Sequence, residues 1–77
     1  MTDEIVIRIA SVPDREQPVA ELWCGDTQWG ELSQEGGRLV LELYPGPAGQ
    51  PWRFAFADVS AALEQARRRL VGGAGGV

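Results

Sequence analysis

Few side chains in this sequence could take part in catalysis. The chain has no histidine and no lysine, and its single cysteine is Cys24. Acyl transfer by a Ser-His-Asp or Cys-His arrangement is therefore excluded, because no residue could serve as the imidazole base. Gly25 and Asp26 follow Cys24, and a carboxylate close to a thiol disfavours the reactive thiolate. We expect Cys24 to be a small buried or hairpin-edge residue.

Carboxylates are the next candidates, as general acids or as metal ligands. The pairs are Glu31 with Glu42 and Asp3 with Glu4. A glycosidase-like pair needs a cleft, which a chain of 77 residues hardly provides. With no histidine and one cysteine, a zinc site would depend on carboxylates almost alone. We therefore expect no catalytic residue, no metal and no cofactor, and we expect that the protein is not an enzyme.

The charge of the chain restricts its partners. Its net charge is −4, which disfavours nucleic acid and anionic membranes and favours a basic partner. Three arginines at residues 67–69 form the one basic run, and at the end of a helix they would complement its dipole. No apolar run approaches the roughly 20 residues of a spanning helix, and the first four residues are acidic where a signal peptide is basic. We expect a cytoplasmic protein.

Three segments show the period-two alternation of β-strands. Residues 4–12 place isoleucines on one side, residues 38–44 place leucines on one side, and residues 52–56 alternate with aromatic side chains. This pattern predicts half-buried strands, the last of them a short fifth strand. Two prolines and three charges in residues 13–18 predict a surface loop.

A hairpin should join two further strands. Gly25-Asp26 suits the positive φ angles of a two-residue turn between residues 19–24 and 27–33. The expected cross-strand partners are Leu22 with Trp29, Trp23 with Gln28, and Val19 with Leu32. A second turn at residues 34–37 leads into the leucine-bearing strand.

The C-terminal part predicts one helix. Apolar residues recur at helical spacing over residues 59–71, Asp58 is a suitable N-cap, and Gly72 supplies the terminating glycine. The sequence thus predicts an α+β fold: an antiparallel meander sheet of four to five strands with one C-terminal helix packed on one face. We expect one domain over residues 1–72 and a flexible glycine-rich tail over residues 73–77.

One helix can cover one face of this sheet, so the other face is the candidate for binding. The predicted alternation places six aromatic, aliphatic and acidic residues together on that uncovered face: Leu22, Trp29, Glu31, Val40, Glu42 and Tyr44. Apolar patches of this kind mark contact sites on small proteins, and Trp and Tyr dominate the energetics of interfaces. The alternative is that the twisted sheet, its loops or the N-terminal strand cover this face.

The sequence Arg69-Leu70-Val71-Gly72-Gly73 resembles the tail of ubiquitin-like modifiers and sulfur carriers, whose Gly-Gly end is adenylated and conjugated. The resemblance covers these five residues. In that family two strands precede the helix and further strands follow it, whereas here the helix comes last. The four residues after Gly73 would also have to be removed. A helix stop followed by a flexible tail accounts for the same residues.

These observations predict a small non-catalytic protein-binding module of a bacterial cytoplasm. An adaptor, an inhibitor, or an immunity or antitoxin-like partner of a basic toxin would have this size, acidity and lack of reactive groups. One alternative is a structural homodimer whose apolar face is its own interface. Another is a carrier or precursor protein modified at its glycine-rich C-terminal tail.

Overall fold

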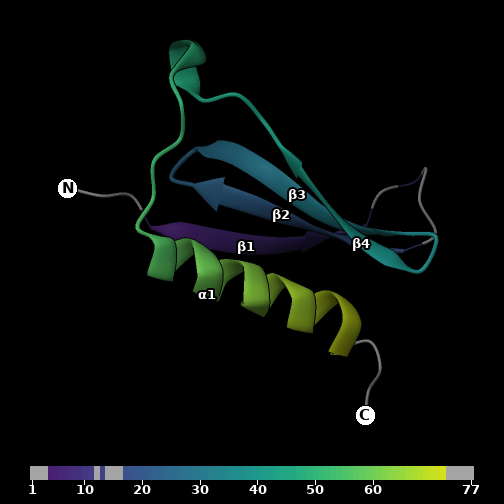
Figure 1. The fold of residues 1–77 in the computed structure, drawn as a ribbon. Helices are drawn as coiled ribbons and strands as arrows, with labels where there is room; N and C mark the ends of the chain where they lie inside the picture. The colour runs from purple at the N-terminus through teal and green to yellow at the C-terminus, as the bar shows by residue number, and fades with distance from the viewer. Residues whose placement is uncertain (1–3, 12, 14–16, 73–77) are drawn as a thin grey trace.

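The computed structural model describes residues 4–11, 13 and 17–72. Four antiparallel strands form one sheet in the order β1-β2-β3-β4, and a single helix packs against it (Figure 1). The predicted α+β meander is confirmed. The elements are β1 (Ile5–Ala10), β2 (Val19–Cys24), β3 (Thr27–Glu35), β4 (Arg38–Leu43), a 3₁₀ turn (Pro47–Gly49), α1 (Phe56–Arg67) and a final π-helical turn (Arg68–Gly72).

Glycine conformation sets the two tight hairpins. Gly25 in the β2–β3 turn has a φ of 60°, and Gly36 and Gly37 in the β3–β4 turn have φ angles of 60° and 81°. Residues with a side chain rarely adopt these angles, so both turns depend on glycine. Glu35 pairs with Arg38 directly across the second turn, which makes it a two-residue loop.

A β-bulge in β3 changes the predicted register. Trp23 lies opposite Gln28 as predicted, but Leu22 lies opposite Gly30 and Ala20 opposite Leu32. The predicted pairs of Leu22 with Trp29 and of Val19 with Leu32 are wrong, because one extra residue of β3 enters the ladder after Trp23. A shift of one residue exchanges the two faces of a strand. The inner residues of β2 therefore join the leucine-bearing face of the sheet.

The core lies between this face and the helix. Its buried members come from β1, β2, β3, α1 and the final turn: Ile7, Ala20, Leu22, Trp29, Leu32, Ala62, Ala66 and Leu70. The helix runs beneath the sheet and lies nearest to β1 (Figure 1). Polar contacts hold its C-terminal end, where Arg69 Nη1 donates to the Ile7 carbonyl at 3.2 Å and Gln34 Nε2 donates to the Leu70 carbonyl at 3.3 Å.

The predicted fifth strand does not form. Residues 51–55 are irregular, and Phe56 already belongs to α1. Alternating burial is nevertheless present, because Phe54 packs on Trp29 with ring centroids 4.9 Å apart and stacks with Trp52 at 5.6 Å. Contact of these two rings with the core, without ladder hydrogen bonds, accounts for Trp52 and Phe54 in the period-two pattern, whereas Phe56, which was predicted to lie on the same side, is 85% exposed.

The helix also begins earlier than predicted. Ala55 is the N-cap, and its carbonyl accepts the N–H groups of Asp58 at 3.0 Å and Val59 at 3.2 Å. The prediction of Asp58 as N-cap is therefore wrong. Asp58 lies within the first turn, where its negative charge still complements the helix dipole.

Candidate partner-binding face

The bulge divides the six predicted binding residues into two groups. Leu22 has 0% and Trp29 has 3% of its surface exposed, and both lie in the core beneath the sheet. Their predicted place on an uncovered face is wrong, since the register shift moves them to the helix side. The other four residues lie on the face opposite the helix, here called the outer face: Glu31, Val40, Glu42 and Tyr44.

Three carboxylates stand side by side on the outer face. Glu21 of β2 lies directly opposite Glu31 of β3, which lies directly opposite Glu42 of β4. We call these residues the glutamate row. Directly opposed residues of antiparallel strands have Cβ atoms about 5 Å apart, and like charges in such pairs are destabilising. Arg8 of β1 lies opposite Glu21 and is the cation at the β1 end of the row.

Aromatic side chains orient two members of the row. Trp23 Nε1 donates to Glu21 Oε1 at 3.1 Å, and the Arg8 guanidinium lies 4.9 Å from the centroid of the Trp23 ring. The Tyr44 hydroxyl donates to Glu31 Oε1 at 3.4 Å. Trp23 thus orients the carboxylate of Glu21, and Tyr44 orients that of Glu31.

Three residues in or next to the glutamate row were not among the predicted binding residues. Arg8, Glu21 and Trp23 alternate with the core residues of β1 and β2, so the period-two pattern of these strands contained the signal. The predicted hairpin register had no bulge. It assigned Leu22 to the outer face and therefore assigned Glu21 and Trp23 to the inner face. Locating the bulge from sequence would have exchanged these assignments.

A cavity elsewhere on the protein has a different character. It is open, has a volume of about 1000 Å³, and lies between the start of β1, the segment before α1 and one side of α1 along most of its length. Its charged lining residues are Glu4, Arg53, Asp58, Glu64 and Arg68. Acidic and basic groups nearly balance there, and the lining supplies neither a thiol nor a hydroxyl nucleophile.

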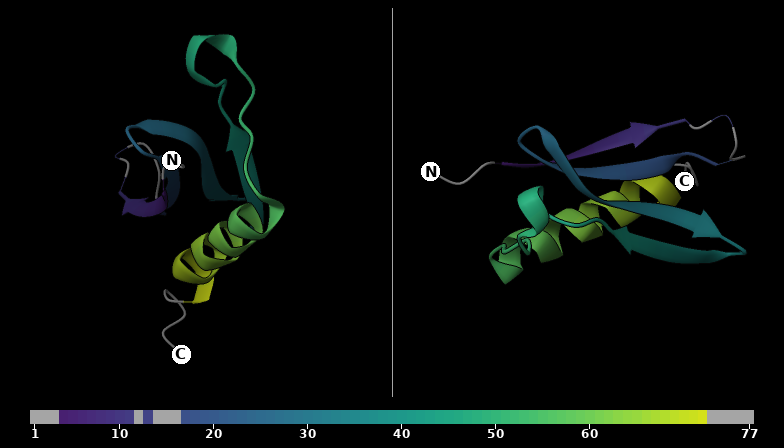
Figure 2. Two further views of the ribbon diagram at one scale, coloured as in Figure 1. Left: turned by 90° about the vertical axis from the view of Figure 1, so that its left-hand side faces the viewer. Right: turned by 90° about the horizontal axis from the view of Figure 1, so that it is seen from above.

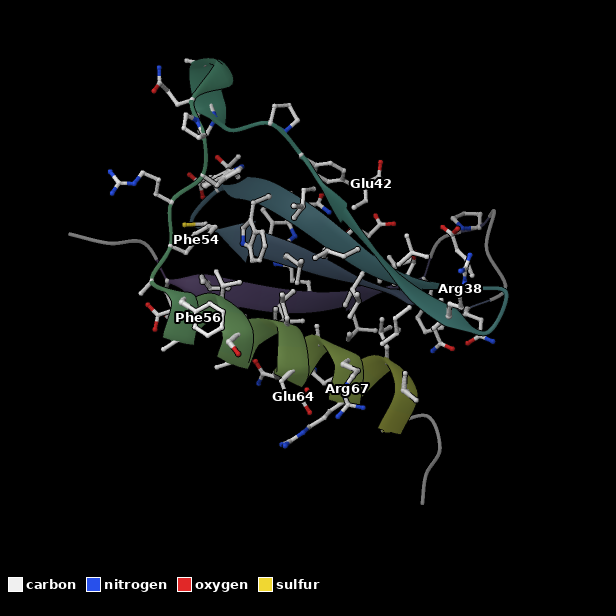
Figure 3. All side chains as sticks on the ribbon, viewed as in Figure 1. Arg38, Glu42, Phe54, Phe56, Glu64 and Arg67 are labelled. Carbon is white, nitrogen blue, oxygen red and sulfur yellow. The ribbon has the colours of Figure 1, made fainter. Side chains whose placement is uncertain are left out.

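Two arginines bind Glu64 on the exposed side of α1. Figure 3 shows Glu64 beside the first of them, Arg67. Arg67 forms a salt bridge with it one turn away, and Arg68 Nε donates to Glu64 Oε2 at 3.2 Å. The hydrogen bond from Arg67 is the main reason why the pKa of Glu64 falls from its ordinary value of 4.5 to about 2. This exposed ion pair stabilises the helix and offers no vacant reactive group.

The other functional expectations concern a metal site, a membrane span and the C-terminal tail. Within residues 4–11, 13 and 17–72, no cluster of three potential ligands could hold a metal ion, and no helix is long and apolar enough for a bilayer. Leu70, part of the ubiquitin-like tail pattern, is buried in the final helical turn. The predicted tail at residues 73–77 lies outside the described residues.

Comparisons with known proteins identify no relative: no protein-family model, curated protein or solved structure matches this chain.

Proposed function

We propose that this chain is a non-catalytic protein-binding module whose outer face receives a basic segment of another protein. The observation that carries the proposal is the glutamate row, in which three carboxylates occupy directly opposed positions on adjacent strands. Arginine or lysine side chains of a partner would relieve the repulsion within the row. The charge of the whole chain, −4, favours the same kind of partner.

The surroundings of the row suit a protein partner. Trp23, Val40 and Tyr44 are half-buried, so they already lie in fixed positions while part of their surface remains accessible. Aromatic side chains contribute much contact area at low entropic cost. Guanidinium groups of a partner could also stack on the rings of Trp23 and Tyr44. Arg8 already makes such a contact, because its guanidinium lies 4.9 Å from the centroid of the Trp23 ring.

A module of this kind acts by occupying its target. An adaptor, an inhibitor, or an immunity-like partner of a basic toxin in the bacterial cytoplasm would each use an acidic face in this way. Charge complementarity accelerates association and excludes wrong partners more than it raises affinity. We therefore expect binding that is fast and that weakens as ionic strength rises.

Titration with a synthetic peptide of alternating arginine and valine, followed by ¹H–¹⁵N NMR, tests this proposal. We expect the Trp23 indole signal and the amide signals of β2 and β3 on the outer face to shift. The double substitution Glu21→Gln and Glu31→Gln retains both hydrogen-bond acceptors and should weaken binding about tenfold, since each exposed ion pair contributes up to about 1 kcal/mol. The double substitution Glu4→Gln and Asp58→Asn is the matched control, because it removes two exposed carboxylates away from the row.

Two results would contradict the proposal. One is a set of shifts confined to the helix side of the protein. The other is equal affinity of the double variant and the wild type for the peptide. A peptide with glutamate in place of arginine should cause no shifts at the row.

A further inference from the structure

The outer edge of β4 is free of any other strand. β4 is the last strand of the sheet order, and the view from above shows no described element running alongside its outer edge (Figure 2, right). The Tyr44 N–H donates to the Trp29 carbonyl at 3.0 Å. Because bonding direction alternates along a strand, the backbone groups of Leu39, Leu41 and Leu43 point away from β3, toward this open edge.

At the opposite edge of the sheet, one side chain bonds to the backbone of β1. There Arg69 Nη1 donates to the Ile7 carbonyl at 3.2 Å, while the helix packs against the inner face of the sheet nearest to β1. Open strand edges invite pairing with other chains, and proteins usually cover them or place charges on them.

Exposed apolar side chains accompany the open edge. Leu39, Leu41 and Leu43 expose 38%, 40% and 65% of their surface, and Phe56 at the start of α1 exposes 85%. Leu39, Leu41 and Phe56 line a groove of about 540 Å³ between β4 and α1. The helix therefore does not cover the last strand, and the apolar side of β4 lacks a partner within the described residues.

We infer that a second copy of this chain covers this edge, with β4 pairing antiparallel to β4 of the partner subunit about a two-fold axis at Val40. That register places Arg38 opposite the partner's Glu42, and by symmetry Glu42 opposite the partner's Arg38. Leu39 then lies opposite the partner's Leu41 and forms hydrogen bonds through its outward-facing backbone. The two charges lie toward opposite ends of β4 on the outer face (Figure 3), as a self-complementary interface requires.

Neighbouring registers lack this complementarity. An axis at Leu41 would place Arg38 opposite the partner's Tyr44 and Glu42 opposite the partner's Val40. An axis at Leu39 would place Arg38 opposite the partner's Val40 and Glu42 opposite the partner's Gly36. If the register were shifted by one residue, or by any odd number of residues, the outward-facing backbone groups of one β4 would lie opposite inward-facing groups of the other. The Val40 axis alone forms two ion pairs between opposite charges.

The dimer also changes the charge at the end of the glutamate row. In the monomer, Glu42 has Glu31 as its one cross-strand neighbour. In the dimer, the partner's Arg38 lies on its other side, so the row ends on a cation at both edges. Leu43 would lie opposite the partner's Gly37, which has no side chain to obstruct it.

Sedimentation velocity over a range of protein concentrations tests this inference with charge reversal. Arg38→Glu and Glu42→Arg should each weaken the dimer at least tenfold, because each creates two like-charge contacts. The double variant Arg38→Glu with Glu42→Arg restores opposite charges and should return the dissociation constant to within about threefold of the wild type. Arg53→Glu, an exposed residue outside the interface, is the control for net charge.

A second variant tests the backbone pairing. Leu41→Pro removes an N–H that points to the open edge and leaves the hydrogen bonds to β3 intact, as proline on edge strands does, so it should be monomeric and folded. In the wild type, hydrogen exchange at Leu39 and Leu41 should slow as protein concentration rises. A monomer at all concentrations would overturn the inference, as would a dimer unaffected by charge reversal. Neither result bears on the peptide test, which uses residues of β2 and β3.

Discussion

Replacement of Trp29 by alanine distinguishes a core residue from a binding residue. Trp29 has 3% of its surface exposed and packs against Phe54 with ring centroids 4.9 Å apart. Truncation of a buried tryptophan costs about 3–5 kcal/mol. Trp29 Nε1 is buried with no hydrogen-bond partner among the described residues, so its removal recovers about 1 kcal/mol of desolvation energy. The expected loss is about 2–4 kcal/mol.

That loss is large for a protein of this length. At about 0.05–0.15 kcal/mol per residue, 77 residues correspond to about 4–12 kcal/mol of total stability. Urea unfolding followed by circular dichroism should show the midpoint of Trp29→Ala lowered by about 2–4 M, for a denaturant slope of about 1 kcal/mol per M. All unfolding curves should be recorded at the same protein concentration, because dimer formation would shift the unfolding midpoint.

Trp23→Ala is the matched control, since it removes the same side chain from the outer face. It loses the hydrogen bond to Glu21 and the contact with Arg8, and should cost less than about 1 kcal/mol. It should instead weaken binding of the basic peptide. Equal stability of the Trp29 variant and the wild type would refute the bulged register and the core that depends on it. A larger loss for Trp23 than for Trp29 would refute it as well.

Two further predictions concern the packing of β3 and the surface of α1. Gly30→Ala should destabilise the protein by about 1–3 kcal/mol in the same urea assay. The reason is that an added Cβ would lie 2.9 Å from the Glu42 carbonyl oxygen and 3.2 Å from Leu22 Cδ1. An unchanged unfolding midpoint would show that β4 does not lie so close to Gly30. The lowered pKa of Glu64 means that its ion pair stabilises the fold above about pH 4.5 and that this contribution is lost as the pH falls toward 2. Glu64→Gln should therefore unfold more easily than the wild type at pH 7 and equally easily near pH 2, and a difference that does not vary with pH would contradict this reasoning.

Local signals in the sequence determined most of the secondary structure. Alternating residues predicted β1 and β4, and Gly25-Asp26 and Gly36-Gly37 predicted the hairpins that make the sheet a meander. These features depend on neighbours in the chain, so they can be read without knowledge of the fold. The helix was recognisable for the same reason, although its first residue was not, because the N-cap Ala55 has no side-chain signal.

Tertiary packing decided which residues the surface presents. Trp29 lies beneath the sheet because Phe54, 25 positions later, offers it a ring to pack on, and the bulge in β3 accompanies that placement. One extra residue then exchanged the faces of β2, buried Leu22, and aligned Glu21 with Glu31 and Glu42. The sequence by itself determined an acidic chain without histidine or lysine, and it predicted a meander sheet of four to five strands with one C-terminal helix. Only the tertiary structure placed the three carboxylates in one row and left the edge of β4 open, because both depend on contacts between residues far apart in the chain.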